Sequence, residues 1–142
     1  MSFENSGPMV QQAAPPYLTF LAGQDLALGN AVYISADGTV SKTTGVQGFV
    51  GIVVAGNKGM KSGTLVTVAC GKSKVRALAY GTITAGDSIV SGPGGTVQTL
   101  ADVAAGDVST SAGTATAINN SKQRRAVCDT GASSGGLAVI IL

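Results

Sequence analysis

Short runs of apolar and β-branched residues alternate with turn residues along most of this chain. The runs have the length of strands and are too short for typical helices, and Gly, Pro, Asn, Asp or Ser bounds them. This pattern predicts strands over residues 18–21, 31–35, 39–42, 49–55, 64–70, 74–80, 87–90, 96–100, 125–128 and 137–142.

Three of these runs also predict how their strands are buried. Residues 64–68 and 74–79 alternate with period two, so each strand should have one face in water. Residues 137–142 are apolar at every position, which predicts a buried or paired strand at the end of the chain. We expect removal of that strand to destroy the fold.

One pattern of turns and strands occurs twice, with a constant separation of 57 residues. Its two copies are Gly29-Asn30-x-Val32 with Gly38-Thr39-Val40, and Gly86-Asp87-x-Ile89 with Gly95-Thr96-Val97. Gly accepts a positive φ and an adjacent Asn or Asp can bond its own backbone, so each copy predicts tight turns between strands. The fold class predicted is all-β, a small barrel or sandwich of two pseudo-repeated halves.

The chain divides into an extended N-terminal arm over residues 1–17 and a β domain over residues 18–142, with an inserted loop over 101–121. The arm contains Pro8, Pro15 and Pro16 and has no apolar periodicity, so it is either a disordered tail or a segment ordered by a neighbouring molecule. If a neighbour orders it, its candidate contact residues are its large apolar side chains, Phe3, Met9, Val10 and Tyr17.

The composition favours assembly with a partner. At 142 residues the chain is long enough for one domain with a real core, but only 11% of its residues are charged and 44% are hydrophobic. A surface with so few charges is poorly soluble alone and is easier to explain if partners cover much of it.

The positive charges are concentrated over residues 58–76, which contain no acid. This segment is either a solvated strand face or an electrostatic docking patch, and Lys58 and Lys61 are our candidate contact residues within it. The net charge is only +2 and no aromatic residues interleave with the lysines, so we do not expect nucleic acid as a partner.

Cys70 and Cys128 lie in apolar runs and are expected to behave as small hydrophobic residues, not as a disulfide framework. No run approaches the roughly 18 apolar residues of a membrane-spanning helix, and no apolar segment follows a basic start. We therefore expect synthesis in a cytoplasm and no membrane partner.

The sequence gives little support for a catalytic site. The chain has no His, which removes Ser-His-Asp and Cys-His catalysis and imidazole metal sites. Residues 131–135 spell a nucleophile elbow, yet an elbow needs a strand-to-helix turn and a general base. Asp129-Thr130-Gly131 resembles the triplet of a retropepsin-like protease, but too few residues follow it to complete a protease lobe.

Two further strings suggest ligand or carrier chemistry. Residues 71–73 resemble the end of a phosphate-binding P-loop, but Val66 stands where that motif needs Gly and a strand follows. Lys61 resembles the carrier lysine of a biotinyl domain, although Gly59 and Ser62 depart from that motif. We therefore predict no catalytic site, no metal and no cofactor.

Residues 18–142 resemble the small capsid cement, or head decoration, proteins of tailed phages. The segments that carry the resemblance are 28–32 (LGNAV), 48–53 (GFVGIV), 85–89 (AGDSI), and 125–128 (RAVC) with 135–142 (GGLAVIIL). The chain departs from the family in Arg125, where Gly is frequent, and in the inserted loop.

The resemblance implies a non-enzymatic virion protein, made in the host cytoplasm, that binds the exterior of an icosahedral capsid as a homotrimer and cements adjacent capsomers. Its partners would be the major capsid protein and its own copies. The alternatives are a phage tail or baseplate β module and, less favoured, the biotinyl-type carrier domain or the retropepsin-like protease considered above.

Overall fold

The computed structural model describes residues 16–100, 112–114 and 126–142. The predicted arm before residue 16, and the predicted loop apart from residues 112–114, lie outside these ranges. The described elements are β1 (Tyr17–Ala22), β2 (Ala31–Ala36), β3 (Thr39–Lys42), β4 (Gly51–Gly56), the 3-10 turn η1 (Lys58–Met60), β5 (Leu65–Ala69), β6 (Lys74–Leu78), β7 (Ser88–Ser91), β8 (Val97–Thr99), β9 (Ala126–Thr130) and β10 (Leu137–Ile141).

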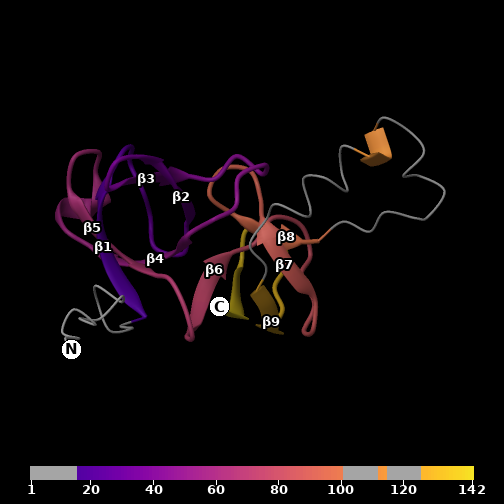
Figure 1. Ribbon diagram of the computed structural model, residues 1–142. Helices are drawn as coiled ribbons and strands as arrows, with labels where there is room; N and C mark the ends of the chain where they lie inside the picture. Colours follow the sequence, from indigo (N-terminus) through magenta and orange to yellow (C-terminus); the bar gives the residue numbers. More distant parts are fainter. Residues whose placement is uncertain (1–15, 101–111, 115–125) are drawn as a thin grey trace, which may run out of the picture.

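The strands form a closed barrel beside a second sheet, which confirms the predicted all-β class. The barrel has the order β1-β3-β2-β4-β5 and closes where β5 pairs with β1. The second sheet has the order β6-β10-β9-β7-β8. Figure 1 shows the barrel on the left and the second sheet on the right.

The two halves repeat one another strand by strand, as the repeated turns predict. Strands β6, β7, β8, β9 and β10 correspond, in this order, to β1, β2, β3, β4 and β5. Each has the same neighbours as its counterpart, except that the second sheet is not closed. The backbone bonds match in detail. Gly23 N–H donates to Val40 O at 2.8 Å, and Tyr80 N–H donates to Val97 O at 2.8 Å, which are equivalent positions.

The repeated Asn and Asp close equivalent turns. Asn30 Oδ1 accepts a hydrogen bond from Ala27 N–H at 2.8 Å, and Asp87 Oδ2 accepts one from Thr84 N–H at 2.9 Å. The glycine before each has a φ of +88° or +92°. Gly followed by Asx is therefore required by the turn that leads into β2 and into β7.

The cores of the two halves are equivalent as well. One buried cluster fills the barrel with Ala22, Leu26, Val32, Val40, Val53, Val66 and Val68. The equivalent positions of the second half belong to the other buried cluster and are Ala79, Ile83, Ile89, Val97, Cys128, Ala138 and Ile140. Short aliphatic residues suffice because each half encloses a narrow interior.

The halves differ where the second sheet stays open between β6 and β8. These strands meet only at the parallel bridge from Ala79 to Val97. The chain entering β2 lies against both sides of this opening, since Leu78 N–H donates to Gly29 O at 2.9 Å and Ala31 N–H donates to Gly95 O at 2.7 Å. We call this contact the seam.

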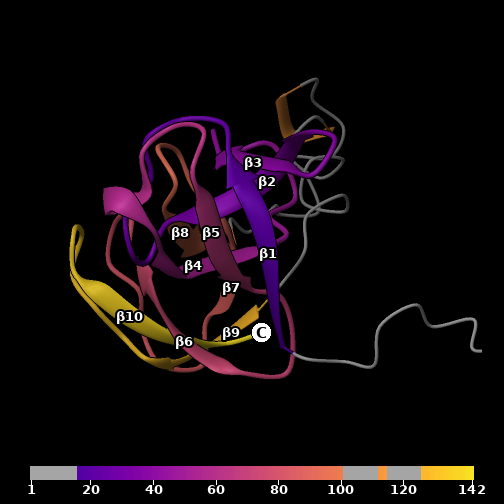
Figure 2. The same ribbon diagram turned by 90° about the vertical axis from the view of Figure 1, so that its left-hand side faces the viewer.

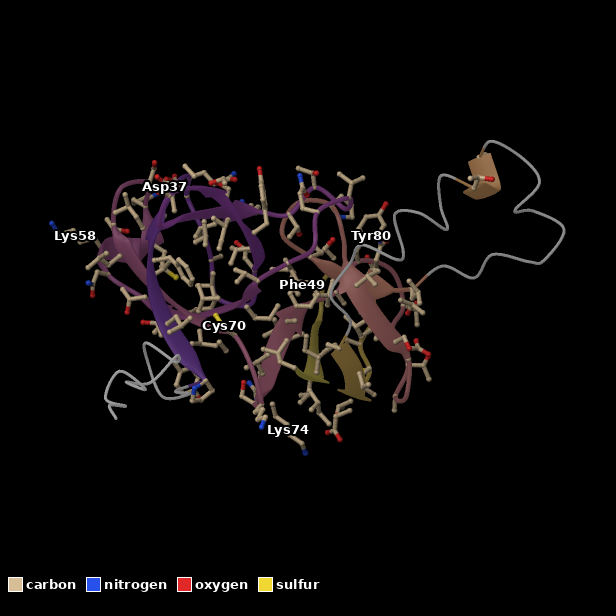
Figure 3. All side chains as sticks on the ribbon, viewed as in Figure 1. Asp37, Phe49, Lys58, Cys70, Lys74 and Tyr80 are labelled. Carbon is tan, nitrogen blue, oxygen red and sulfur yellow. The ribbon has the colours of Figure 1, made fainter. Side chains whose placement is uncertain are left out.

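The seam is also part of the hydrophobic core. Phe49 and Ile52 of the first half belong to the same buried cluster as the interior of the second half. Figure 3 shows Phe49 between the barrel and the second sheet. The two halves therefore share one core, although each repeats the other.

Two local features complete the fold. The segment carrying Lys58 forms the short η1 turn, with Lys58 and Met60 at φ values of 49° and 57°. The last strand is paired on both sides, as predicted, and its side chains alternate between interior and solvent. The chain enters β1 and leaves β10 at the same end of the molecule (Figure 2).

Candidate interaction surface

The structure does not gather the predicted contact residues at one place. Phe3, Met9 and Val10 lie outside the described residues. Tyr17 begins β1 and is about half exposed. Lys58 and Lys61 are exposed near the other end of the β1–β5 pair, where Leu21 faces Leu65.

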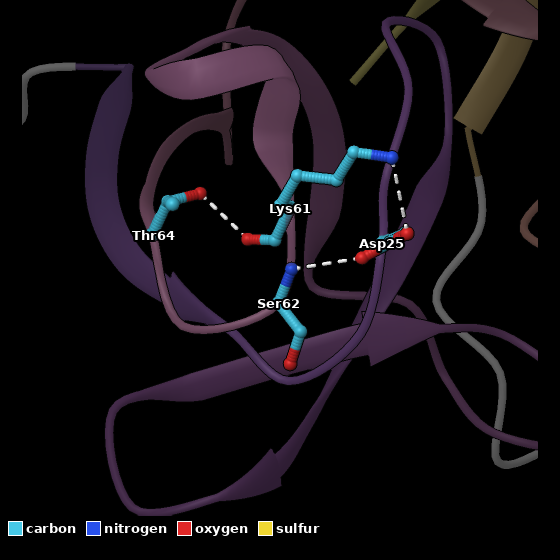
Figure 4. Close-up of polar contacts among 4 residues, drawn as sticks. All are labelled: Asp25, Lys61, Ser62 and Thr64. Atoms are coloured by element: carbon cyan, nitrogen blue, oxygen red, sulfur yellow. Dashed lines mark hydrogen bonds and ion pairs between the residues drawn. The ribbon is translucent and has the colours of Figure 1, made fainter.

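Lys61 is held in a small polar network at the end of the barrel (Figure 4). Its Nζ lies 3.3 Å from Asp25 Oδ2, while Ser62 N–H donates to Asp25 Oδ1 at 3.0 Å. Thr64 Oγ1 donates to the Lys61 carbonyl at 2.6 Å. The hydrogen bond from the Ser62 amide is the largest single cause that holds the pKa of Asp25 below its usual value, and the Lys61 ammonium group lowers it further. This network joins the turn between η1 and β5 to the loop that follows β1.

The segments that resemble catalytic motifs adopt other structures. Asp129 lies near the end of β9 and pairs with Lys74, whose Nζ is 3.5 Å from Asp129 Oδ2. Residues 131–136 connect β9 to β10, so a strand follows where a nucleophile elbow needs a helix. Ser134 Oγ in this connection accepts a hydrogen bond from Gly81 N–H at 3.0 Å.

Within the described ranges, no three His, Cys, Asp or Glu side chains come together as metal ligands. None of the helical segments in that part of the chain is long and apolar enough to cross a membrane. Residues 71–73 form the turn into β6, with Lys72 at a φ of 42°, and no helix begins there.

The most distinctive surface is the outer side of the second sheet. Leu137, Val139 and Ile141 of β10 and Val127 of β9 form what we call the apolar face. Leu137, Ile141 and Val127 are 48%, 42% and 49% exposed, and Ile141 lies directly across from Val127. The alternate residues of β10, Ala138 and Ile140, are fully buried, so this strand presents apolar side chains on both sides.

A groove continues the apolar face toward the barrel. It encloses about 250 Å³ between β4, β6, β10 and the turn before β2, and it is lined by Leu28, Gly29, Val53, Val54, Arg76 and Leu137. Leu137 belongs to both the face and the groove, so the two form one continuous apolar surface.

Basic residues border this surface along β6. Lys74 faces Ile141 and Arg76 faces Val139 across the strand pair. Lys74 is paired with Asp129. No carboxylate of the described residues lies within ion-pair distance of Arg76, which also lines the groove.

Sequence reasoning missed this surface, although a signal was present. By itself, the apolar run 137–142 predicts only a buried or paired strand. Leu65, Thr67 and Ala69 hold the positions in β5 that Leu137, Val139 and Ile141 hold in β10. The exchange of Thr67 and Ala69 for large apolar residues marks an outer face that is specific to the second half.

No protein-family model matches this sequence, and no curated protein matches it either. Among solved structures, the chain is similar to the N base of the head fiber gp8.5 in bacteriophage phi29. The TM-score is 0.59 and the sequence identity 17%, and the match covers 89% of this chain and 92% of that chain. The two chains therefore share a fold over most of their lengths.

Proposed function

We propose that this protein is a structural virion protein that binds the outer surface of an icosahedral phage capsid as a homotrimer and cements adjacent capsomers. The observation that carries the proposal is the fold shared with a phage head fiber base over 89% of the chain. The resemblance of residues 18–142 to head decoration proteins supports the same class of function, and its partners would be the major capsid protein and its own copies.

The physical mechanism is linkage between binding and lattice stability. A protein that binds the assembled lattice, and not the separated capsomers, stabilises the lattice by mass action. A trimer that contacts several capsomers binds more tightly than one protomer, because its second and third contacts form at a high effective concentration. No bond needs to be made or broken, so a β scaffold without a catalytic centre is sufficient.

The sparse surface charge is consistent with this role. Charged residues make up 11% of the chain, and the second half exposes the apolar face and its groove. Such a surface favours assembly into a larger particle. A virion on whose exterior the protein is permanently bound would keep this surface covered.

The test is addition of the purified protein to expanded phage shells that lack it. We expect binding that saturates at a fixed number of copies per shell and a higher temperature of shell disruption. Electron microscopy of saturated shells should show trimers on the outer surface. Saturation without any gain in stability would make the protein a decoration and not a cement. No binding to shells, with binding to isolated tails or baseplates, would overturn the proposal.

A further inference from the structure

The apolar face and its groove have the properties of a site for an extended peptide segment. The face is a row of large apolar side chains along β10, and the groove opens from its end at Leu137. A volume of about 250 Å³ lies below the roughly 300–1,000 Å³ of small-molecule sites and suits single large side chains. Arg76 adds a cation at the border between the face and the groove.

We propose that residues 1–14 of a neighbouring copy of this chain occupy the apolar face and groove, with Glu4 paired to Arg76. The inference rests on the proposed function only in requiring that copies lie side by side, as in the proposed homotrimer. It assigns a receptor surface to the N-terminal arm.

The chemistry of the arm complements this surface. Residues 1–14 contain Phe3, Met9 and Val10 as large apolar side chains. Glu4 is the only acid before Asp25, and it stands next to Phe3. A segment that places Phe3 against the groove therefore brings the Glu4 carboxylate next to Arg76 at the border of the groove. An arginine bordering an apolar site pairs well with a carboxylate.

The point at which the arm leaves the body favours a neighbouring copy over the same chain. Pro16 O accepts a hydrogen bond from Cys70 N–H at 2.7 Å, so the arm departs beside the turn that leads into β6. Ser73 of that turn is bound to Leu142 N–H at 3.0 Å, which places β10 at the same end. The face extends from this end back along the body, so the arm of the same chain would have to fold back to cover it. Consecutive prolines hold the backbone extended and oppose such a reversal.

The length of the arm is sufficient. Fourteen extended residues reach about 45 Å, whereas five residues of strand β10 extend roughly 17 Å. An arm from an adjacent copy can therefore cross a gap between bodies and still lie along the whole face.

The first experiment uses the full-length protein as an equal mixture of unlabelled and ¹⁵N-labelled copies. A zero-length carbodiimide couples carboxylates to lysines that contact them. In the Arg76→Lys variant, we expect coupling of Glu4 to position 76 in peptides that combine one labelled and one unlabelled partner. Lys58, at the far end of the barrel, serves as the control and should not couple to Glu4. Coupling within single copies alone would show that the arm covers its own face, and it would overturn the proposal.

The second experiment exchanges the two charges. Arg76→Glu should weaken self-association by about tenfold in sedimentation, because it places two carboxylates together. The double variant E4R/R76E should restore self-association, whereas Lys58→Glu should leave self-association unchanged. Failure of E4R to rescue R76E, together with absent inter-copy coupling, would overturn the proposal. If the inference fails in this way while the variants still bind and stabilise shells, the proposed function stands and only this inference is wrong. If Ile141→Asp abolishes shell binding and inter-copy coupling is absent, the capsid is the occupant of the face.

Discussion

Gly51 lies so close to the backbone of the neighbouring strand that it has no room for a side chain. A Cβ added there would overlap the carbonyl oxygen of Ala69 and would lie 2.7 Å from Val68 Cγ1. Both neighbours belong to β5, which pairs with β4 in the barrel wall. The φ of Gly51 is not in the left-handed region, so the requirement for glycine is purely steric.

We therefore predict that Gly51→Ala lowers the free energy of unfolding by roughly 1–3 kcal/mol, the range of an overpacked core. Gly71→Ala is the matched control, since its Cβ would meet nothing within 4 Å and its φ is not left-handed. That variant should change stability by less than about 0.5 kcal/mol. Urea unfolding measures both values, and equal stabilities of the two variants would contradict the steric argument.

The pKa of Asp25 gives a second prediction at this scale. The hydrogen bond from the Ser62 amide is the largest single cause that lowers this pKa, and it does not depend on the Lys61 side chain. Lys61→Met should therefore raise the pKa only part of the way to the ordinary value of about 3.9, as measured by NMR titration of the carboxyl carbon. Because the folded pKa is lowered, the network stabilises the fold above the unfolded pKa, and this contribution is lost as pH falls through the folded pKa. Complete return to the ordinary value in Lys61→Met would mean that the ion pair dominates.

At the scale of elements, strand positions followed from the sequence because apolar runs and turn residues are local signals. The wet faces of β5 and β6 and the constant offset between β2–β3 and β7–β8 were both predicted and are confirmed. The equivalence of β9 and β10 to β4 and β5 was not visible, because the offset changes after residue 100.

The seam was equally out of reach of sequence reasoning. Its contacts at the opening join backbone groups, such as Gly29 O and Leu78 N–H, that carry no residue-specific signal. The candidate contact residues were chosen by charge and size alone, so they are spread over the barrel and the arm. The apolar face depends on which side of β10 is covered, and that is set by the second half as a whole.

β10 is the element on which we expect the second half to depend most. It lies between β6 and β9, and its Ala138 and Ile140 are fully buried. Deletion of residues 137–142 should therefore give an unfolded far-ultraviolet spectrum and collapsed amide dispersion. Ile141→Thr, on the exposed side of the same strand, should keep the native spectrum. A folded, dispersed spectrum for the deletion would show that β6 and β9 can pair without it.

At the scale of the whole molecule, the shared core makes two repeated halves into one cooperative unit. The seam joins them through the backbone of Gly29 and Ala31 and through buried Thr43, whose Oγ1 donates to Gly92 O at 2.8 Å. Ser91 Oγ similarly donates to Gln47 O at 2.6 Å. Separating the halves would expose Phe49 and Ile52 and leave these polar groups without their partners, so neither half is expected to unfold alone.

Amide hydrogen exchange at Val68 and Ile140 tests this cooperativity, because these residues hold equivalent core positions in the two halves. We predict equal free energies of opening at both. Thr43→Val keeps the shape of the side chain but removes the seam hydrogen bond from a fully buried site, and it should lower both values together by about 1–2 kcal/mol. A decrease confined to Ile140 would mean that the second half opens by itself. The barrel would then be an independent folding unit to which the second half is only docked.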